Sequence, residues 1–360
     1  MEKEKIKVLV TDDSLVTRKF LVKMLSLDPE IEVIGTACNG VEAIEFIRKT
    51  KPDVITMDIN MPLMDGFEAT INIMSEMPVP IVIVSSGYTI SETEKKFRAL
   101  EVGAVAIMPL PYGVGNPDYE LTMKRFVSTV KLMSQVKLIK RWNRSTNSDQ
   151  KNNNPDLILP FEDIKDIGSK VRILVIGASA GGPIALKEIL DHIPSDLPCP
   201  VIIVQHIDAE FTQGFADWLN LTSAIHVSLA TDGEVLIPGN AYMAPGDHHI
   251  GVSAIDTIKV SKEVHESGLR PSVSYLFRSV RGVYCDKALA VLLSGMGADG
   301  ATELKLLKDA GSITIAQDAA SSLIHGMPGE AIKLGGACYV LSPSQIVNFI
   351  QKCVLTLSNK

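Results

Sequence analysis

Short apolar runs alternate with stretches of helical periodicity along the first third of the chain. Apolar residues recur at helical spacing in stretches such as Val16–Ser26 and Gly40–Thr50. The apolar runs around them lie at 6–10, 53–57, 79–84 and 104–108. Because buried parallel strands read as continuous apolar runs, this alternation predicts a parallel sheet with helices on both faces.

The same alternation returns in the second half of the chain. Apolar runs reappear at 171–176, 200–204, 288–293 and 312–316. Two α/β sheets are therefore expected, and 360 residues suffice for two domains of ordinary size.

A polar segment separates the two patterns. Residues 142–156 are rich in Asn and show no periodicity, which is typical of a linker. Just before them, 124–144 mixes Lys and Arg with apolar residues at helical spacing, which favours a last helix running into the linker. The predicted parts are a first domain at 1–125, a helical extension and linker at 126–168, and a second domain at 169–358.

Composition narrows the possible environments and partners. The net charge of −7 gives no reason to expect nucleic-acid binding, which requires concentrated Lys and Arg. The five cysteines are scattered without a CxxC pair, which favours reduced thiols. The charged N-terminus contains no secretory signal, and no apolar stretch approaches the roughly 20 residues that cross a bilayer. We expect a cytoplasmic protein without membrane insertion.

Acidic residues follow two of the predicted strands in the first domain. Asp12 and Asp13 follow the first run, Asp58 follows the second, and Ser85 and Ser86 follow the third. The carboxyl ends of parallel strands converge on one crevice, where clustered carboxylates suit Mg²⁺ and Asp58 could accept a phosphoryl group. The alternative is that these aspartates only cap helices.

This part of the chain resembles the response-regulator receiver family, through VTDDS at 10–14 and MDINMPLMDG at 57–66. The resemblance implies a flavodoxin-like doubly wound fold, with Asp58 as the phosphoacceptor and a histidine kinase as the phosphodonor. It also implies Mg²⁺ held by Asp12, Asp13 and Asp58 with the backbone of Asn60, and Ser85 as the switch hydroxyl.

One position departs from the receiver pattern. Receivers carry Lys before the Pro that ends the fifth strand, whereas this chain has Leu110 before Pro111. An ammonium group would pair with the phosphoryl charge. Its absence predicts weak or absent activation by phosphorylation.

A serine lies in a glycine-rich turn at the start of the second domain. The run 171–176 leads into Gly177-Ala178-Ser179-Ala180-Gly181-Gly182 and then a helical segment. Small residues around Ser179 permit the sharp strand-to-helix turn that exposes a nucleophile. Two alternatives are a turn selected for close packing and a phosphate-cradling loop, although the spacing is GxxxGG rather than GxGxxG.

A nucleophilic serine needs a general base, and His206 is the candidate. His206 directly follows the strand PVIIVQ at 200–205, and Asp299 follows the strand at 288–293 within a glycine-rich loop. Ser179, His206 and Asp299 thus stand at three strand ends of one expected sheet, as a catalytic triad requires. Met296 in the same loop is the predicted oxyanion donor, or alternatively apolar filling of the pocket wall.

The whole chain resembles the chemotaxis protein-glutamate methylesterase family. The matching segments are VIGASAGGP, VIIVQHIDAEFTQGFADWL, DGEVLIPGNAYMAPGDHHI, RPSVSYLFRSV, VLLSGMGADG and IAQDAASSLIHGMPGEA. The resemblance implies a Rossmann-like doubly wound hydrolase domain that removes methyl esters from glutamates of chemoreceptors without a cofactor. It also implies deamidation of receptor glutamines, and a receiver that covers the hydrolase cleft until it is phosphorylated.

Two residues near this site depart from the family pattern, and one alternative function stays open. Ala180 replaces a usual Thr and Ser274 replaces a usual Asp, which could alter rate or substrate choice. The alternative is a receiver fused to a non-catalytic ligand-binding or scaffolding module, in which Asp208 would bind a ribose.

Overall fold

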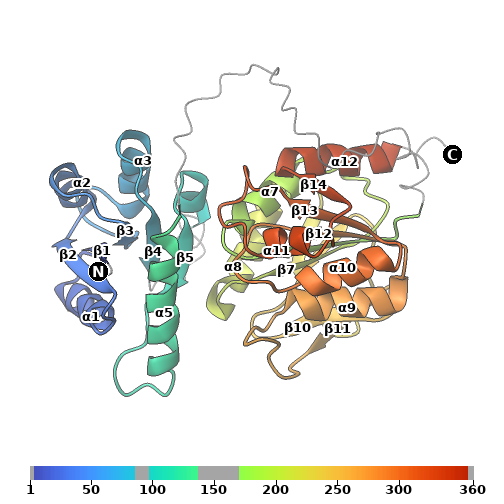
Figure 1. Cartoon of the computed structure of the whole chain (residues 1–360), viewed down its shortest axis with the longest axis horizontal. Coiled ribbons are helices and arrows are strands. Elements are labelled where there is room, and N and C mark those ends of the chain that lie inside the picture. The colour runs from blue at the N-terminus through green and yellow to red at the C-terminus, as the bar shows by residue number, and fades with distance from the viewer. Residues whose placement is uncertain (1–3, 86–96, 137–169, 356–360) are drawn as a thin grey trace. The chain divides into compact units, whose positions relative to one another are not determined.

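The computed structural model describes residues 4–85, 97–136 and 170–355. The chain divides into two compact units, Met1–Asp149 and Gln150–Lys360, and each is described by itself (Figure 1). Ser86 and the predicted linker at 142–156 lie outside the described residues.

The first unit contains a five-stranded parallel sheet. Its order, β2-β1-β3-β4-β5, is the flavodoxin-like order, which confirms the predicted fold. The strands are β1 (Ile6–Thr11), β2 (Ile31–Ala37), β3 (Val54–Met57), β4 (Ile81–Ser85) and β5 (Ala106–Pro109). Every residue of β3 and β4 is buried, which explains their continuous apolar sequences.

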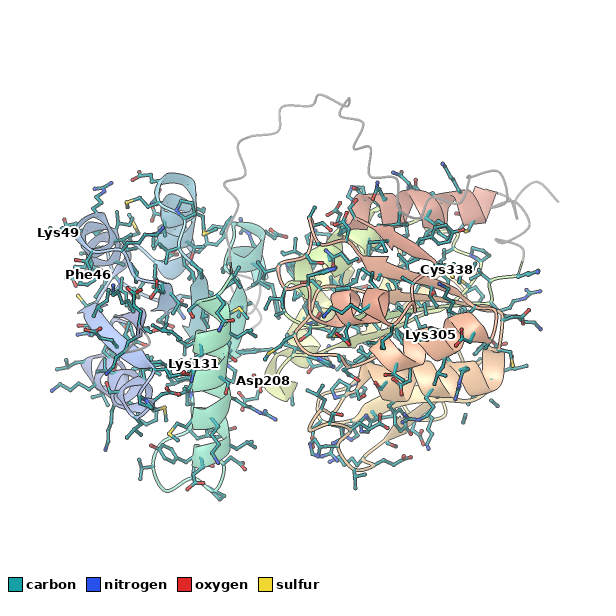
Figure 2. The ribbon with its side chains drawn as sticks, viewed as in Figure 1. Phe46, Lys49, Lys131, Asp208, Lys305 and Cys338 are labelled. Carbon is teal, nitrogen blue, oxygen red and sulfur yellow. The ribbon has the colours of Figure 1, made fainter. Side chains whose placement is uncertain are left out.

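Helices cover both faces of this sheet. α1 (Leu15–Ser26) contacts α5 (Tyr119–Met133), and α2 (Gly40–Lys49) contacts α3 (Gly66–Glu76). The side chains of Ser14, Asn39 and Asp65 accept backbone hydrogen bonds in the first turns of α1, α2 and α3, which fixes where these helices begin. Lys131 on α5 (Figure 2) donates to Asp28 at 3.0 Å. The domain boundary predicted at residue 125 falls within α5.

The second unit contains a seven-stranded parallel sheet in the order β14-β13-β12-β6-β7-β9-β8. The strands are β6 (Ile173–Ala178), β7 (Val201–Gln205), β8 (His226–Leu229), β9 (Asn240–Met243), β12 (Ala288–Leu292), β13 (Ile313–Gln317) and β14 (Tyr339–Leu341). The chain runs from β6 to β7 on one side and reaches β12 on the other. The strand order therefore reverses at β6, which confirms the doubly wound prediction and marks the usual position of a site.

Two groups of helices and one hairpin surround the seven-stranded sheet (Figure 1). One group is α7 (Gly182–His192), α8 (Ala209–Thr222) and α12 (Pro343–Leu355), and the other is α9 (Val273–Tyr284), α10 (Ala301–Asp309) and α11 (Met327–Lys333). The antiparallel hairpin of β10 (His249–Ala254) and β11 (Thr257–Ser261) packs on α9 and was not predicted. Within the described ranges, no helix is long and apolar enough to span a membrane.

Gly66 begins α3 where no side chain fits. A Cβ at this position would lie 2.0 Å from the backbone oxygen of Asp58. We predict that Gly66→Ala lowers the free energy of unfolding of the first unit by about 1–3 kcal/mol, because backbone must move to admit the methyl group. Hydrogen exchange of peptides from 4–85 measures the change. Gly113→Ala is the control, because its Cβ would meet nothing within 4 Å, and an equal effect of both substitutions would contradict the prediction.

Candidate active site and phosphoacceptor site

Adjacent parallel strands bring Ser179 and His206 together. Ala178 at the end of β6 pairs with Gln205 at the end of β7, and the next residue of each strand is Ser179 or His206. The N–H of His206 donates to the carbonyl of Ala178 at 2.9 Å. Because neighbouring strands lie about 5 Å apart, the serine and the histidine stand side by side. In the described part of the chain, Ser179 Oγ itself makes no hydrogen bond.

Asp299 meets the imidazole of His206. Its Oδ2 lies 3.0 Å from His206 Nε2, and the two side chains are only 5% and 12% exposed. Asp299 lies in the loop between β12 and α10, and β12 pairs directly with β6. The sheet thus gathers the three predicted residues at one edge, and Nδ1 is the imidazole nitrogen left available for the serine.

The N-terminus of α9 holds the carboxylate of Asp299. Val273 N donates to Oδ2 at 2.7 Å, and Ser274 N donates to Oδ1 at 3.0 Å. Ser272 Oγ donates to Oδ1 at 2.9 Å. The first N–H groups of a helix have no partner within the helix and favour an anion. Asp299 is therefore hydrogen-bonded to His206, to the cap residue Ser272 and to the first two N–H groups of α9.

These contacts decide the charge of Asp299. Burial by itself would raise the pKa of Asp299, but the hydrogen bond and charge of His206 and the donors of Ser274 outweigh it. The pKa of Asp299 is held well below its usual range. The carboxylate thus stays ionised and can orient the imidazole and stabilise an imidazolium.

Buried polar side chains fix the turn that carries Ser179. Gln205 Nε2 donates to the carbonyls of Ser179 and His206, at 2.9 and 3.0 Å. Ser294 Oγ donates to the carbonyl of Ala180 at 2.7 Å, and the backbone carbonyl of Ser294 accepts from Ser179 N at 3.0 Å. Sequence reasoning missed Gln205 and Ser294. Their only signal was polarity at the end of an apolar strand.

Glycines let the segments of the site approach one another. Gly181 has φ +79°, a left-handed conformation that other residues rarely adopt, and α7 begins at the next residue. A Cβ at Gly295 would lie 2.7 Å from Ser179 Cβ. The loop with Met296 therefore packs directly against the serine turn.

The remaining predicted residues of the site lie in this loop and in α9. Met296 is 55% exposed, so its side chain does not fill the core. Within the described residues, the N–H groups of Met296 and Ala180 have no acceptor. Ser274 accepts a hydrogen bond from Gly300 N at 2.8 Å and helps to hold the Asp299 loop.

Other histidines are engaged elsewhere. His192 Nδ1 contacts the carbonyl of Glu188 within α7. His249 is fully buried, and its Nε2 contacts the carbonyl of Val264. His206 is thus the histidine that the fold pairs with a buried carboxylate.

The predicted acidic residues of the first unit lie at neighbouring strand ends. β1 pairs with β3, and Asp58 N donates to the carbonyl of Thr11 at 2.9 Å. Asp12 Oδ1 accepts from Ser14 N, and Asp58 Oδ2 accepts from Asn60 N at 3.1 Å. Ser85 is buried at the end of β4, next in the sheet to β3.

Burial and repulsion between carboxylates disfavour the ionised forms of Asp58 and Asp12. Desolvation, followed by the charge of Asp12, raises the pKa of Asp58 to about 6. Desolvation also raises the pKa of Asp12 to about 6, with a further contribution from Asp13. Arg18 donates to the backbone carbonyls of Asp12 and Asp13, and its charge lowers the pKa of Asp12, but burial outweighs it. Leu110, just after β5, adds no positive charge.

The donor set of the pocket fits a magnesium ion. No group of three His, Cys, Asp or Glu side chains forms a metal cage in the described residues. Mg²⁺ needs no such cage, because it is usually held by one or two carboxylates and keeps several waters. Carboxylates whose ionisation is disfavoured by burial and mutual repulsion are suited to a divalent cation.

Comparisons with known proteins assign a family to each unit. Residues 174–350 match the family model described as CheB methylesterase, and residues 8–113 match the response regulator receiver domain. A protein-glutamate methylesterase/protein-glutamine glutaminase of Geobacter metallireducens is 49% identical over 95% of this chain and 97% of its own. One of Syntrophus aciditrophicus is 46% identical over 96% and 98%. The crystal structure of the Thermotoga maritima CheB methylesterase catalytic domain covers 51% of this chain and 98% of its own, with 36% identity and a TM-score of 0.49.

The raised pKa of Asp58 makes a prediction about stability. An acid whose pKa is higher in the folded than in the unfolded state contributes stability when the pH is below its unfolded-state pKa, which is near 3.8 for Asp58. This contribution is lost as the pH rises through the folded-state pKa of about 6. Asp58→Asn should therefore raise the free energy of unfolding of the first unit at pH 7.5 by about 1–2 kcal/mol. Urea unfolding between pH 4 and 8, followed by hydrogen exchange in this unit, measures it. Exposed Asp118, whose side chain makes no cap hydrogen bond, is the control as Asp118→Asn. A stability unchanged or lowered by Asp58→Asn would contradict the argument.

Proposed function

Because the chain belongs to the protein-glutamate methylesterase/protein-glutamine glutaminase family, we propose that Ser179, His206 and Asp299 are the triad that hydrolyses glutamyl methyl esters on chemoreceptors. The observation that carries this proposal is the contact between His206 and the buried, ionised Asp299. Asp299 follows β12, which pairs with β6, the strand that ends just before Ser179. A non-catalytic ligand-binding module would not require a serine, a histidine and an ionised aspartate at one edge of the sheet.

The geometry assigns a role to each side chain. Ser179 Oγ attacks the ester carbonyl while His206 Nδ1 accepts its proton, because Nε2 is engaged with Asp299. The imidazolium then gives the proton to the leaving methoxide, and methanol departs. A water molecule, activated by the same histidine, hydrolyses the acyl-serine and regenerates the enzyme.

The tetrahedral intermediate requires hydrogen-bond donors for its oxyanion. We assign this role to the N–H groups of Met296 and Ala180, which have no acceptor within the described residues and flank Ser179. The N-terminus of α7, which begins three residues after Ser179, adds a favourable potential for negative charge.

Deamidation of receptor glutamines is the second activity proposed. The relatives carry protein-glutamine glutaminase in their names. The chemistry is the same acyl transfer with ammonia as the leaving group, and it needs no additional residue. The comparisons give no support to the alternative of a non-catalytic ligand-binding or scaffolding module.

The receiver domain is proposed to regulate the esterase. Asp58 accepts a phosphoryl group from a histidine kinase, and Asp12, Asp13, Asp58 and the backbone of Asn60 hold Mg²⁺. The ion neutralises charge on the phosphoryl group and the carboxylates. Buried Ser85, at the neighbouring strand end, is the proposed switch hydroxyl. The protein meets its kinase and receptors in the cytoplasm.

The triad makes a prediction about turnover. Ser179→Ala should abolish release of methanol from methylated receptor, and Asp299→Asn should lower kcat about 10⁴-fold because the imidazole loses its fixed tautomer. Gas chromatography of methanol measures both. Ser342→Ala, a substitution at the cap of α12, is the control that keeps activity. Methanol release by Ser179→Ala at the wild-type rate would refute the triad.

The missing lysine makes a prediction about regulation. A small-molecule phosphodonor should increase methanol release by less than about twofold in the wild-type chain, because no ammonium pairs with the phosphoryl group. Leu110→Lys should restore activation. Leu110→Met, which adds no charge, is the control. Strong activation of the wild-type protein would contradict the role assigned to position 110.

A further inference from the structure

The hydroxyl of Ser272 lies between two carboxylates. Ser272 is fully buried just before α9, and its Oγ is 2.9 Å from Asp299 Oδ1 and 3.5 Å from Glu266 Oε2. A serine hydroxyl has one proton to donate. Asp299 and Glu266 therefore compete for a single hydrogen bond, and the shorter distance belongs to Asp299.

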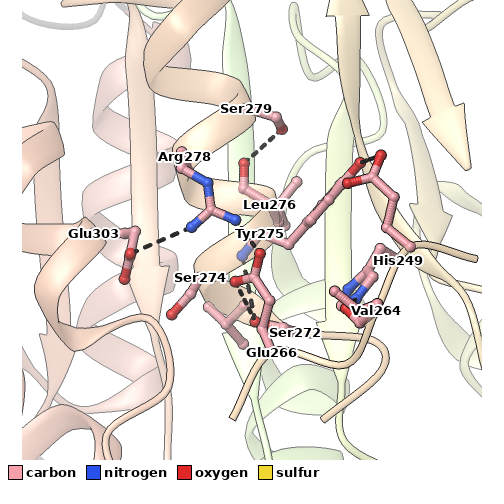
Figure 3. Close-up of polar contacts among 12 residues, drawn as sticks. His249, Val264, Glu266, Ser272, Ser274, Tyr275, Leu276, Arg278, Ser279 and Glu303 are labelled. Atoms are coloured by element: carbon pink, nitrogen blue, oxygen red, sulfur yellow. Dashed lines mark hydrogen bonds and ion pairs between the residues drawn. The ribbon is translucent and has the colours of Figure 1, made fainter. Parts of the chain in front are cut away.

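An arginine holds the competing carboxylate. Arg278, one turn into α9, forms an ion pair with Glu266 Oε1, and its other terminal nitrogen lies 3.6 Å from Glu303. Figure 3 shows Arg278 between Glu303 and Glu266, with Glu266 beside Ser272. With the charge of Glu266 balanced by the guanidinium, its attraction for the Ser272 proton is reduced.

We propose that Ser272 is a positioning residue for the esterase reaction, and that Arg278 keeps the Ser272 proton on Asp299 by holding Glu266. The inference rests on the proposed triad. Ser272, the cap residue of α9, gives Asp299 a side-chain donor, and Val273 N and Ser274 N are the backbone donors from the first turn of the helix. The hydroxyl fixes the plane of the carboxylate, and that plane sets the direction in which His206 Nε2 is held.

Ser272 also caps α9, so its two roles must be separated. Tyr275 N donates to Ser272 Oγ at 3.3 Å. Ser342 offers a matched comparison in the same unit, because Gln345 N donates to Ser342 Oγ at the same 3.3 Å and no carboxylate of the triad is involved. Loss of a cap costs stability in both variants, whereas loss of a donor to Asp299 affects only one.

The first experiment measures kcat and KM for methanol release by the full chain. Ser272→Ala should lower kcat about 10- to 100-fold with KM unchanged, as expected for loss of a hydrogen bond to a charged group. Ser272→Thr keeps the hydroxyl and should retain most of kcat, and Ser342→Ala should leave kcat unchanged. In an Asp299→Asn background, Ser272→Ala should cause no further loss, because its effect passes through Asp299.

The second experiment tests the competition. Arg278→Gln should lower kcat about 3- to 10-fold, because the released Glu266 draws the Ser272 hydroxyl away from Asp299. Arg278→Gln combined with Glu266→Gln should recover kcat, and Glu266→Gln alone should retain it. Failure of the second substitution to rescue the first would overturn the role of Arg278.

Failure of this inference is distinguishable from failure of the proposed function. If Ser179→Ala and Asp299→Asn lose activity while Ser272→Ala keeps the wild-type kcat, the triad stands and the role of Ser272 is overturned. Equal losses of kcat in Ser272→Ala and Ser342→Ala would also overturn it, because capping would then explain both. If Ser179→Ala retains activity, the proposed triad itself fails.

Discussion

The hydrogen bonds from the N-terminus of α9 to the carboxylate of Asp299 are the interaction on which the rest of the site depends. Asp299 is charged and almost fully enclosed, and an unpaired charge in such a place would be costly. The first N–H groups of α9 and the hydroxyl of Ser272 replace the hydrogen bonds that water would make to the carboxylate. His206 Nε2 makes the other hydrogen bond, to Oδ2. The helix therefore stabilises the charge of Asp299 and fixes the position of its carboxylate. The carboxylate in turn orients the imidazole of His206.

Hydrogen bonds to the turn that carries Ser179 hold the serine beside the imidazole of His206. The turn is hydrogen-bonded to Gln205 from β7 and to Ser294 after β12, the two strands that flank β6. Backbone groups thus fix the spacing of the serine and the histidine. Such prior ordering lowers the reorganisation needed at the moment of reaction.

The two units treat buried carboxylates in opposite ways. In the hydrolase unit, His206 and the donors of Ser274 outweigh burial and hold the pKa of Asp299 well below the usual range, so the carboxylate is ionised at neutral pH. In the receiver unit, burial and neighbouring carboxylates raise the pKa of Asp58 to about 6, so the pocket favours a cation. The first arrangement suits a fixed electrostatic role, and the second suits a site whose charge changes with its ligands. Leu110, just after β5, adds no cation to that balance.

The sequence by itself determined that there are two parallel sheets, their most buried strands and the residues that follow those strands. Fully buried strands must be apolar, and polar residues directly after them are conspicuous. Ser179, His206 and Asp58 were predicted as site residues in that way, and Asp299 was predicted from the glycine-rich loop that follows β12. The edge strand β2 was missed because its burial is mixed, and the β10–β11 hairpin because its residues gave no continuous apolar run. Only the tertiary structure decided which nitrogen of His206 faces Asp299 and that Ser272, 27 positions away along the chain, donates to it. Those facts depend on how distant segments pack, and no local pattern of residues records them.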